Sequence, residues 1–114
     1  MRKPLAAALL LLAACGAPPS AATPEDERVL RPVPDAPDAA RPHIERGDGT
    51  FVRASAAQRA GDDASALDLY RGARSSYLQA EALCSGFIPA PLIDRATECV
   101  KRMAALQRQA HNPK

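Results

Sequence analysis

The search for catalytic chemistry begins with residue types that move protons, bind metals or act as nucleophiles. Of the two histidines, His43 and His111, neither has a cysteine, aspartate or glutamate at metal-ligand spacing. Asp62 and Asp63 are adjacent carboxylates, but they follow Gly61 where a helix should begin, so we interpret them as capping residues rather than an acid–base pair. The sequence has no glycine-rich phosphate loop, no G-x-S-x-G motif and no C-x-x-C motif. These observations predict a protein that is not an enzyme, with no metal, no cofactor and no evident small-molecule substrate.

The remaining chemistry belongs to three cysteines, Cys15, Cys84 and Cys99. Cys15 directly follows an apolar run, residues 5–14, which is preceded by Arg2 and Lys3 and is too short to span a bilayer. Such a run is typical of a cleaved export signal, which predicts an oxidising compartment for the rest of the chain. An even number of cysteines is then left, which favours a disulfide between Cys84 and Cys99 worth roughly 3 kcal/mol. Two buried free thiols are the alternative.

The stretch Leu12-Ala13-Ala14-Cys15-Gly16 resembles the lipobox of bacterial lipoproteins. The resemblance implies that residues 1–14 are a signal peptide and that Cys15 becomes the lipidated N-terminus, carrying a thioether-linked diacylglycerol and an acyl chain such as palmitate. Gly16, rather than an aspartate, resembles lipoproteins sent to the outer membrane, facing the periplasm or the cell surface. An ordinary secretory signal with an incidental cysteine is the alternative. No later segment has eighteen consecutive apolar residues, so we expect no transmembrane helix.

The charge balance of the sequence limits the kinds of partner that we expect, and its aromatic content limits the kind of core. The sequence has 15 Lys+Arg and 13 Asp+Glu, and the basic excess disappears when Arg2 and Lys3 leave with the signal. A neutral chain gives no electrostatic case for binding nucleic acid or an anionic lipid surface. With two Tyr, two Phe and no Trp, the core must come from alanine, leucine and a few larger groups, which favours closely packed helices.

The chain divides by composition into a tether and a domain. Residues 15–45 are predicted to be a lipidated, disordered tether, because 16–42 is rich in proline and alanine and its only large apolar residues are Val29, Leu30 and Val33. The short stretch Glu25–Leu30 is interpreted as the solubilising middle of this tether, with a short helix or docking motif as the alternative. Residues 46–114 are predicted to form a helical domain. The prolines in the tether are Pro18, Pro19, Pro24, Pro32, Pro34, Pro37 and Pro42.

Three helices are expected in the domain, over about 50–60, 62–84 and 91–110. The second and third each carry a stripe of residues spaced four and three apart, which is typical of two antiparallel helices that pack together. Tyr70 and Tyr77 lie on the first stripe and are expected in the core. Four arginines are expected on a solvated surface. The stripes are Ala66, Tyr70, Ala73, Tyr77, Ala80 and Cys84, then Leu92, Ala96, Cys99, Met103, Leu106 and Ala110; the arginines are Arg71, Arg74, Arg95 and Arg102.

The turn Gly61-Asp62 followed by Ala66, Tyr70 and Ala73 resembles the second half of a tetratricopeptide (TPR) repeat. The resemblance covers one repeat at most, about residues 47–80, and the first helix lacks the aromatic residue and the Leu-Gly pair of that family. It implies an all-α fold: a TPR-like helical hairpin with a third, capping helix. The peptide-binding groove of full TPR arrays is not implied, because those need about three repeats.

Phe87 and Ile88 are the candidate partner-binding residues. They are large, apolar and lie in a loop bounded by Gly86 and Pro89, where they either fold onto the end of the hairpin or form an exposed anchor for a protein partner. Two functions are therefore expected from the sequence. The first is a membrane-anchored, non-enzymatic adaptor or assembly factor for an envelope protein complex, and the alternative is a constitutive structural subunit of a larger membrane-associated assembly.

Overall fold

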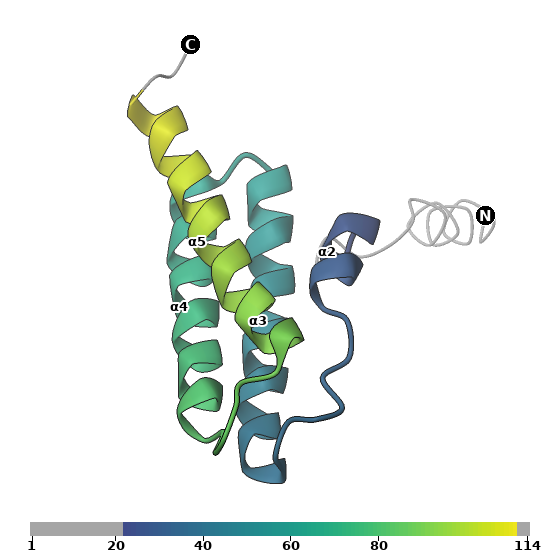
Figure 1. The fold of residues 1–114 in the computed structure, drawn as a ribbon. Helices are drawn as coiled ribbons and strands as arrows, with labels where there is room; N and C mark the ends of the chain where they lie inside the picture. Colours follow the sequence, from purple (N-terminus) through teal and green to yellow (C-terminus); the bar gives the residue numbers. More distant parts are fainter. Residues whose placement is uncertain (1–21, 112–114) are drawn as a thin grey trace, which may run out of the picture.

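The computed structural model describes residues 22–111, and in this part of the chain it contains helices and no strand (Figure 1). The prediction of an all-α fold is confirmed. The candidate lipidation site Cys15 and the predicted signal peptide, residues 1–14, lie outside the described residues. The elements are α2 (Pro24–Val29), the short 3₁₀ turn η1 (Asp38–Ala40), α3 (Arg41–Arg59), α4 (Asp63–Ala82) and α5 (Ala90–His111).

The turn between α3 and α4 forms as its sequence predicts. Gly61 has φ +84°, a left-handed conformation that suits glycine at the end of a helix. Asp62 is the N-cap of α4, and its carboxylate accepts a hydrogen bond from the Ser65 amide at 3.3 Å. Asp62 thus has the predicted capping role, and Asp63 is the first residue of α4. α3 and α4 run antiparallel, and the predicted stripe of α4 is fully buried from Ala66 to Ala80: Ala66, Tyr70, Ala73, Tyr77 and Ala80 all have 0% exposure.

The first helix begins at Arg41, well before the predicted start near Thr50. The Gly47-Asp48-Gly49 sequence favours a turn by propensity, but tertiary packing overrides it. A Cβ added at Gly47 would lie 2.6 Å from the Tyr77 ring, so the missing side chain is what lets that ring lie against α3. Glycine is therefore required here by a close approach between two helices rather than by a turn.

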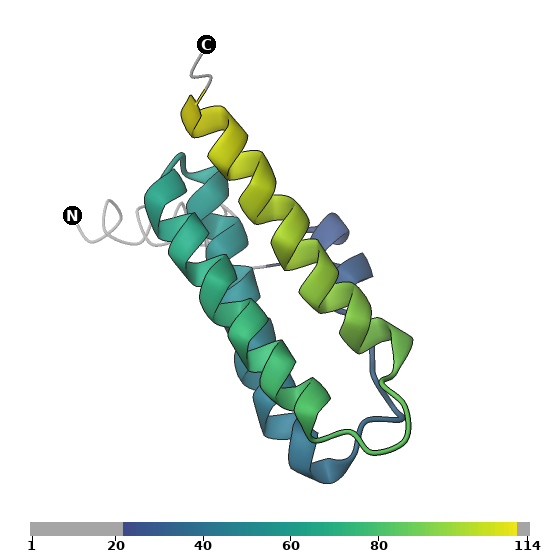
Figure 2. The same ribbon diagram turned by 60° about the vertical axis from the view of Figure 1, so that its left-hand side comes forward.

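α5 packs antiparallel to α4, and α2 lies on the other side of α5 (Figures 1 and 2). The predicted stripe of α5 is buried at Leu92, Ala96, Cys99 and Leu106, whereas Ala110 is exposed near the end of the helix. The loop between α4 and α5 lies at the same end of the bundle as η1, and the α3–α4 turn lies at the opposite end (Figure 2).

For residues 22–45 the prediction of a disordered tether is wrong. Two prolines that suggested a linker instead lie in first turns of helices, Pro24 in α2 and Pro42 in α3, where a missing N–H costs nothing. Thr23 and Asp26 form a capping box at the start of α2. Small and medium apolar side chains along this segment pack into the core: Val33, Ala36, Ala40 and Ile44 are buried, and Val29 and Leu30 are half-buried against them.

Candidate docking surfaces

The described part of the chain contains two clusters of charged side chains, and both are internal. In the first, Asp48 of α3 accepts hydrogen bonds from three donor atoms. Arg95 of α5 contributes two of them, Nε to Oδ1 at 2.8 Å and Nη2 to Oδ2 at 3.1 Å, and the Tyr77 hydroxyl of α4 contributes the third at 2.6 Å. Arg95 is only 2% exposed. One carboxylate therefore joins all three long helices.

The charge on Asp48 also acts on Tyr77. Burial, together with the adjacent carboxylate and the hydrogen bond to it, raises the pKa of the Tyr77 hydroxyl well above its usual value. The phenol accordingly stays protonated and remains a donor at all working pH values. The cluster therefore holds α3, α4 and α5 together.

The second cluster holds α2 on the bundle. Asp26 of α2 is 1% exposed and accepts a hydrogen bond from Arg102 of α5 at 2.9 Å, and Arg59 of α3 lies 3.8 Å away. Burial by itself raises the pKa of Asp26, but hydrogen bonds from Ser55, the Thr23 backbone and Arg102 outweigh it, so the pKa lies below its usual value. Asp26 is therefore an ionised group that fastens α2 to α3 and α5.

Arg102 is the centre of that second cluster. Its guanidinium lies 4.6 Å from the centroid of the Phe51 ring, donates to the Tyr70 hydroxyl at 3.0 Å, and pairs with Glu98 at 2.9 Å. Tyr70 in turn donates to Gln58 at 2.8 Å. A cation on an aromatic face with two carboxylate partners is well compensated for its partial burial.

The prediction of a solvated surface is thus wrong for two of the four arginines. Arg95 and Arg102 are seven residues apart on α5 and face inward, whereas Arg71 and Arg74 of α4 are exposed as expected. The sequence carried a usable signal, because Arg95, Glu98 and Arg102 are spaced three and four apart beside the apolar stripe of α5. Their partners, the buried Asp26 and the half-buried Asp48, could not be identified, since both lie in segments whose sequence is typical of a linker or a turn.

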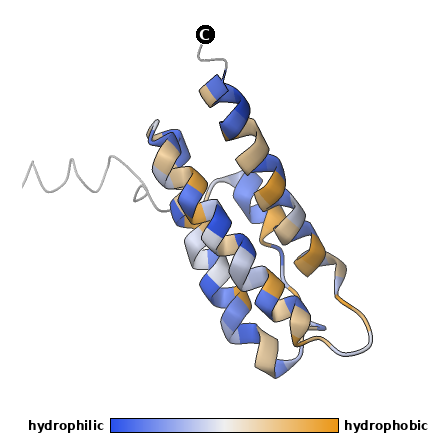
Figure 3. Ribbon diagram, turned by 90° about the vertical axis from the view of Figure 1, so that its left-hand side faces the viewer, coloured by the Kyte–Doolittle hydropathy of each residue, from blue (hydrophilic) through white to orange (hydrophobic). Residues whose placement is uncertain are grey.

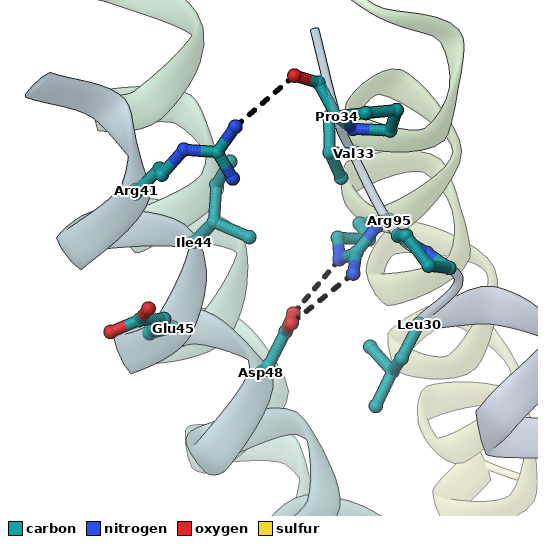
Figure 4. Close-up of a pocket in the computed structure, with 9 residues that line it drawn as sticks. Leu30, Val33, Pro34, Arg41, Ile44, Glu45, Asp48 and Arg95 are labelled. Carbon is teal, nitrogen blue, oxygen red and sulfur yellow. Dashed lines mark hydrogen bonds and ion pairs between the residues drawn. The ribbon is translucent and has the colours of Figure 1, made fainter. Parts of the chain in front are cut away.

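A small pocket of about 290 Å³ lies between residues 30–34 and the first half of α3 (Figure 4). Two guanidinium groups line this pocket, and both already bind other groups of the protein. Arg95 is held by Asp48, and Arg41 donates to the Pro34 carbonyl at 3.1 Å and lies 3.6 Å from Asp38. Because both charges already have partners, we interpret the pocket as part of the contact between residues 30–34 and α3.

The two remaining cysteines are free thiols, so the predicted Cys84–Cys99 disulfide is not formed. Cys84 follows the end of α4, where its thiol contacts the Ala80 carbonyl at 3.5 Å. Cys99 is buried in the middle of α5, roughly 13 Å of helical rise beyond the start of that helix, so the two thiols lie at different levels of the bundle. Burial raises the pKa of Cys99 to about 12, which makes it an unreactive core residue.

The candidate partner-binding residues separate in the structure. Ile88 is half-buried and packs against the core, whereas Phe87 is 64% exposed at the end of the bundle. Phe87 also belongs to a wider pattern. The exposed large hydrophobic residues among those described all fall between residues 78 and 100: Leu78, Leu83, Phe87, Ile93 and Val100. Figure 3 looks onto α4 and α5, the two helices that carry three of the five, Leu78, Ile93 and Val100.

Within residues 22–111 no group of three or more His, Cys, Asp or Glu side chains could hold a metal ion, so His43 and His111 belong to no such group. None of the helices described is long and apolar enough to cross a membrane. Comparison with known proteins adds no assignment, since no family model, no curated protein and no solved structure matches this chain.

Proposed function

We propose that this protein is a membrane-anchored lipoprotein that acts as a non-enzymatic adaptor or assembly factor for an envelope protein complex, with its anchor on Cys15. The single observation that carries the adaptor role is Phe87, a large aromatic residue exposed at the tip of a folded domain. Exposed aromatic residues are frequent anchors in protein–protein interfaces. The charged clusters support the same view, because their members hold helices together instead of lining an open cleft.

The resemblance to a lipobox supports a lipid anchor on Cys15. Because residues 22–45 belong to the folded domain, the segment between the anchor and the domain is shorter than the tether expected from the sequence. Only residues 16–22 separate Cys15 from the capping residue Thr23, and a chain of that length spans about 25 Å when fully extended. The domain is therefore held close to its membrane, not displayed at the end of a long tether. We assign that membrane to the outer membrane, facing the periplasm or the cell surface, from Gly16.

We further propose that α3 and α4 are a TPR-like hairpin and that α5 is its capping helix. The support is local: Gly61 makes the turn, and Ala66, Tyr70 and Ala73 fill the contact between the helices. α2, which covers part of α3 and α5, has no place in that description.

The second candidate function is a constitutive structural subunit of a larger membrane-associated assembly. It is favoured by the apolar residues exposed between 78 and 100, which a permanent interface would cover. Circular dichroism of residues 22–114 expressed alone separates the two candidates. A cooperative thermal transition supports an adaptor, whereas an unfolded chain supports a subunit that is ordered only in its assembly.

Two experiments test the adaptor proposal. Labelled palmitate is expected to enter the wild-type chain and not the Cys15→Ser variant, and equal labelling of both contradicts the anchor. A photo-crosslinking residue placed at Phe87 is expected to capture a protein partner in the native cells. The same residue placed at Arg53, which is exposed on α3, is the matched control. Equal yields at the two positions contradict a docking role for the loop.

A further inference from the structure

The flank of α4 that faces away from α3 borders α5 along a shared groove. Leu67 of α4 lines a pocket of about 290 Å³ together with Leu106 and Gln107 of α5. Arg74 and Leu78 follow Leu67 on the same face of α4, at i+7 and i+11. Val100 and Ile93 precede Gln107 on the same face of α5, at steps of seven. The α4–α5 face is defined here by Leu67, Arg74, Leu78, Glu81, Ile93, Val100 and Gln107.

The middle of the α4–α5 face is apolar and uncovered. Leu78 is 39% exposed, Ile93 44% and Val100 46%. Two charged residues bracket Leu78 along α4: Arg74 lies one turn before it and Glu81 almost one turn after it. Within residues 22–111 neither of these two side chains forms an ion pair, in contrast to Arg71, which pairs with Asp68 at 2.8 Å.

This arrangement is complementary to itself. A two-fold axis that lies in the plane of this face, perpendicular to α4 and level with Leu78, brings Leu78 of two copies together. The same operation places Arg74 of one copy opposite Glu81 of the other, twice, because the two residues lie nearly equal distances on either side of Leu78. On α5 it places Ile93 opposite Val100 of the second copy.

The other simple pairing does not fit. An axis parallel to the helices would place α4 over α5 of the second copy, with Arg74 and Glu81 opposite the apolar side chains of that helix. Charged groups would then lose water without a partner, which is unfavourable. We infer that the α4–α5 face binds a second copy of this chain, with α4 antiparallel to α4 and two Arg74–Glu81 pairs across the interface.

The dimer goes beyond the proposed function and does not rest on it. Phe87 lies in the loop and not in the α4–α5 face, so it stays available to a different protein. Neither the anchor on Cys15 nor an adaptor role is needed for the two copies to associate. Failure of palmitate labelling would therefore leave this inference untouched, and failure of dimerisation would leave the anchor untouched.

The test uses cysteine crosslinking of the full-length protein in its native cells. Leu78→Cys places a thiol on the proposed two-fold axis, so oxidation with copper phenanthroline is expected to give a disulfide-linked dimer on a non-reducing gel. The wild-type chain controls for Cys84 and Cys99. Arg53→Cys, exposed on α3, is the matched control and is expected to stay monomeric.

Charge reversal then tests the pairing. In the Leu78→Cys chain, Arg74→Glu is expected to lower the dimer yield about tenfold, and Glu81→Arg to do the same. The two reversals combined in one chain are expected to restore the yield, and so is mixing the two single reversals. Three results would each overturn the inference: no dimer with Leu78→Cys, a yield that ignores both reversals, or a crosslink from residue 78 to another protein.

Discussion

The two flanks of α5 differ in their residues and in whether the rest of the chain covers them. On one flank Asp94, Arg95 and Arg102 form ion pairs with α2, α3 or the segment that joins them. Glu98 on the same flank pairs with Arg102 of its own helix. On the other flank Ile93 and Val100 are exposed beside α4. The charged flank is the covered one and the apolar flank is the open one.

This difference shows how the chain uses its N-terminal segment. A charged flank is costly to bury unless every charge finds a partner, and α2 supplies one in Asp26. An apolar flank is costly to leave in water, and the described residues supply nothing to cover it. The chain therefore covers the charged flank of α5 with its own N-terminal residues. The apolar flank stays exposed, and we infer that another protein molecule covers it.

The largest effect is expected from Asp48→Ala. Removing this carboxylate leaves the Arg95 guanidinium buried without its counter-ion, which should lower the free energy of unfolding by about 3–5 kcal/mol. Urea denaturation followed by circular dichroism measures the change. Glu45→Ala, an exposed position one turn earlier on α3, is the control and should be nearly neutral. Equal stability of the two variants would show that the covered flank is not held by charge.

Asp26→Asn is expected to cost less, about 1–3 kcal/mol at pH 7, because Arg102 keeps Glu98 as a partner. The loss should depend on pH. The pKa of Asp26 is lowered in the folded chain, so its stabilisation is present above the unfolded pKa of about 3.9 and disappears as the pH falls through the folded value. Urea titrations at pH 7 and pH 3 should show wild type and variant converging in acid. A constant difference would contradict an ionised Asp26.

Gly47→Ala probes the packing under the covered flank instead of its charge. The new methyl would overlap the buried Tyr77 ring, and the overpacking should cost about 1–3 kcal/mol, reduced by the better helix propensity of alanine. Gly49→Ala is the matched control, because a Cβ there meets nothing within 4 Å. The control should be neutral or slightly stabilising. Thermal melts of both variants check the sign.

The smallest effect on stability is expected on the open flank. Ile93→Ser and Val100→Ser replace half-exposed side chains, so each should change the free energy of unfolding of an isolated chain by no more than about 0.5 kcal/mol. Both should nevertheless weaken the dimer, which sedimentation velocity of the full-length protein measures. A variant that loses stability but keeps the dimer would reverse the roles given to the two flanks.

The sequence predicted the parts of this fold that rest on periodic patterns. The α4 stripe, the capping Asp62, the Gly61 turn and most of the α5 stripe follow from local rules, and they are confirmed. What it missed depends on contacts between distant residues. The start of α3 depends on Tyr77 meeting Gly47, and the order of α2 depends on Asp26 meeting Arg102.

The candidate site was predicted in part for the same reason. Phe87 is exposed as a docking residue should be, but its neighbour Ile88 turns inward, and no local rule distinguishes two adjacent apolar residues in a loop. The disulfide was inferred from the number of cysteines, whereas its geometry depends on how α4 and α5 align. Lipidation of Cys15 remains a prediction.

Hydrogen exchange of the full-length protein tests the contrast between the two flanks most directly. If residues 22–40 cover the charged flank, amides of that segment that form helical or cap hydrogen bonds should be strongly protected from exchange. The amides of Leu30, at the end of α2, and Ala40, in η1, are two examples. Asp26→Asn should speed exchange in α2 and leave α4 unchanged. Exchange of both amides in the wild type at the rate of an unstructured chain would contradict the account, since both flanks of α5 would then be open.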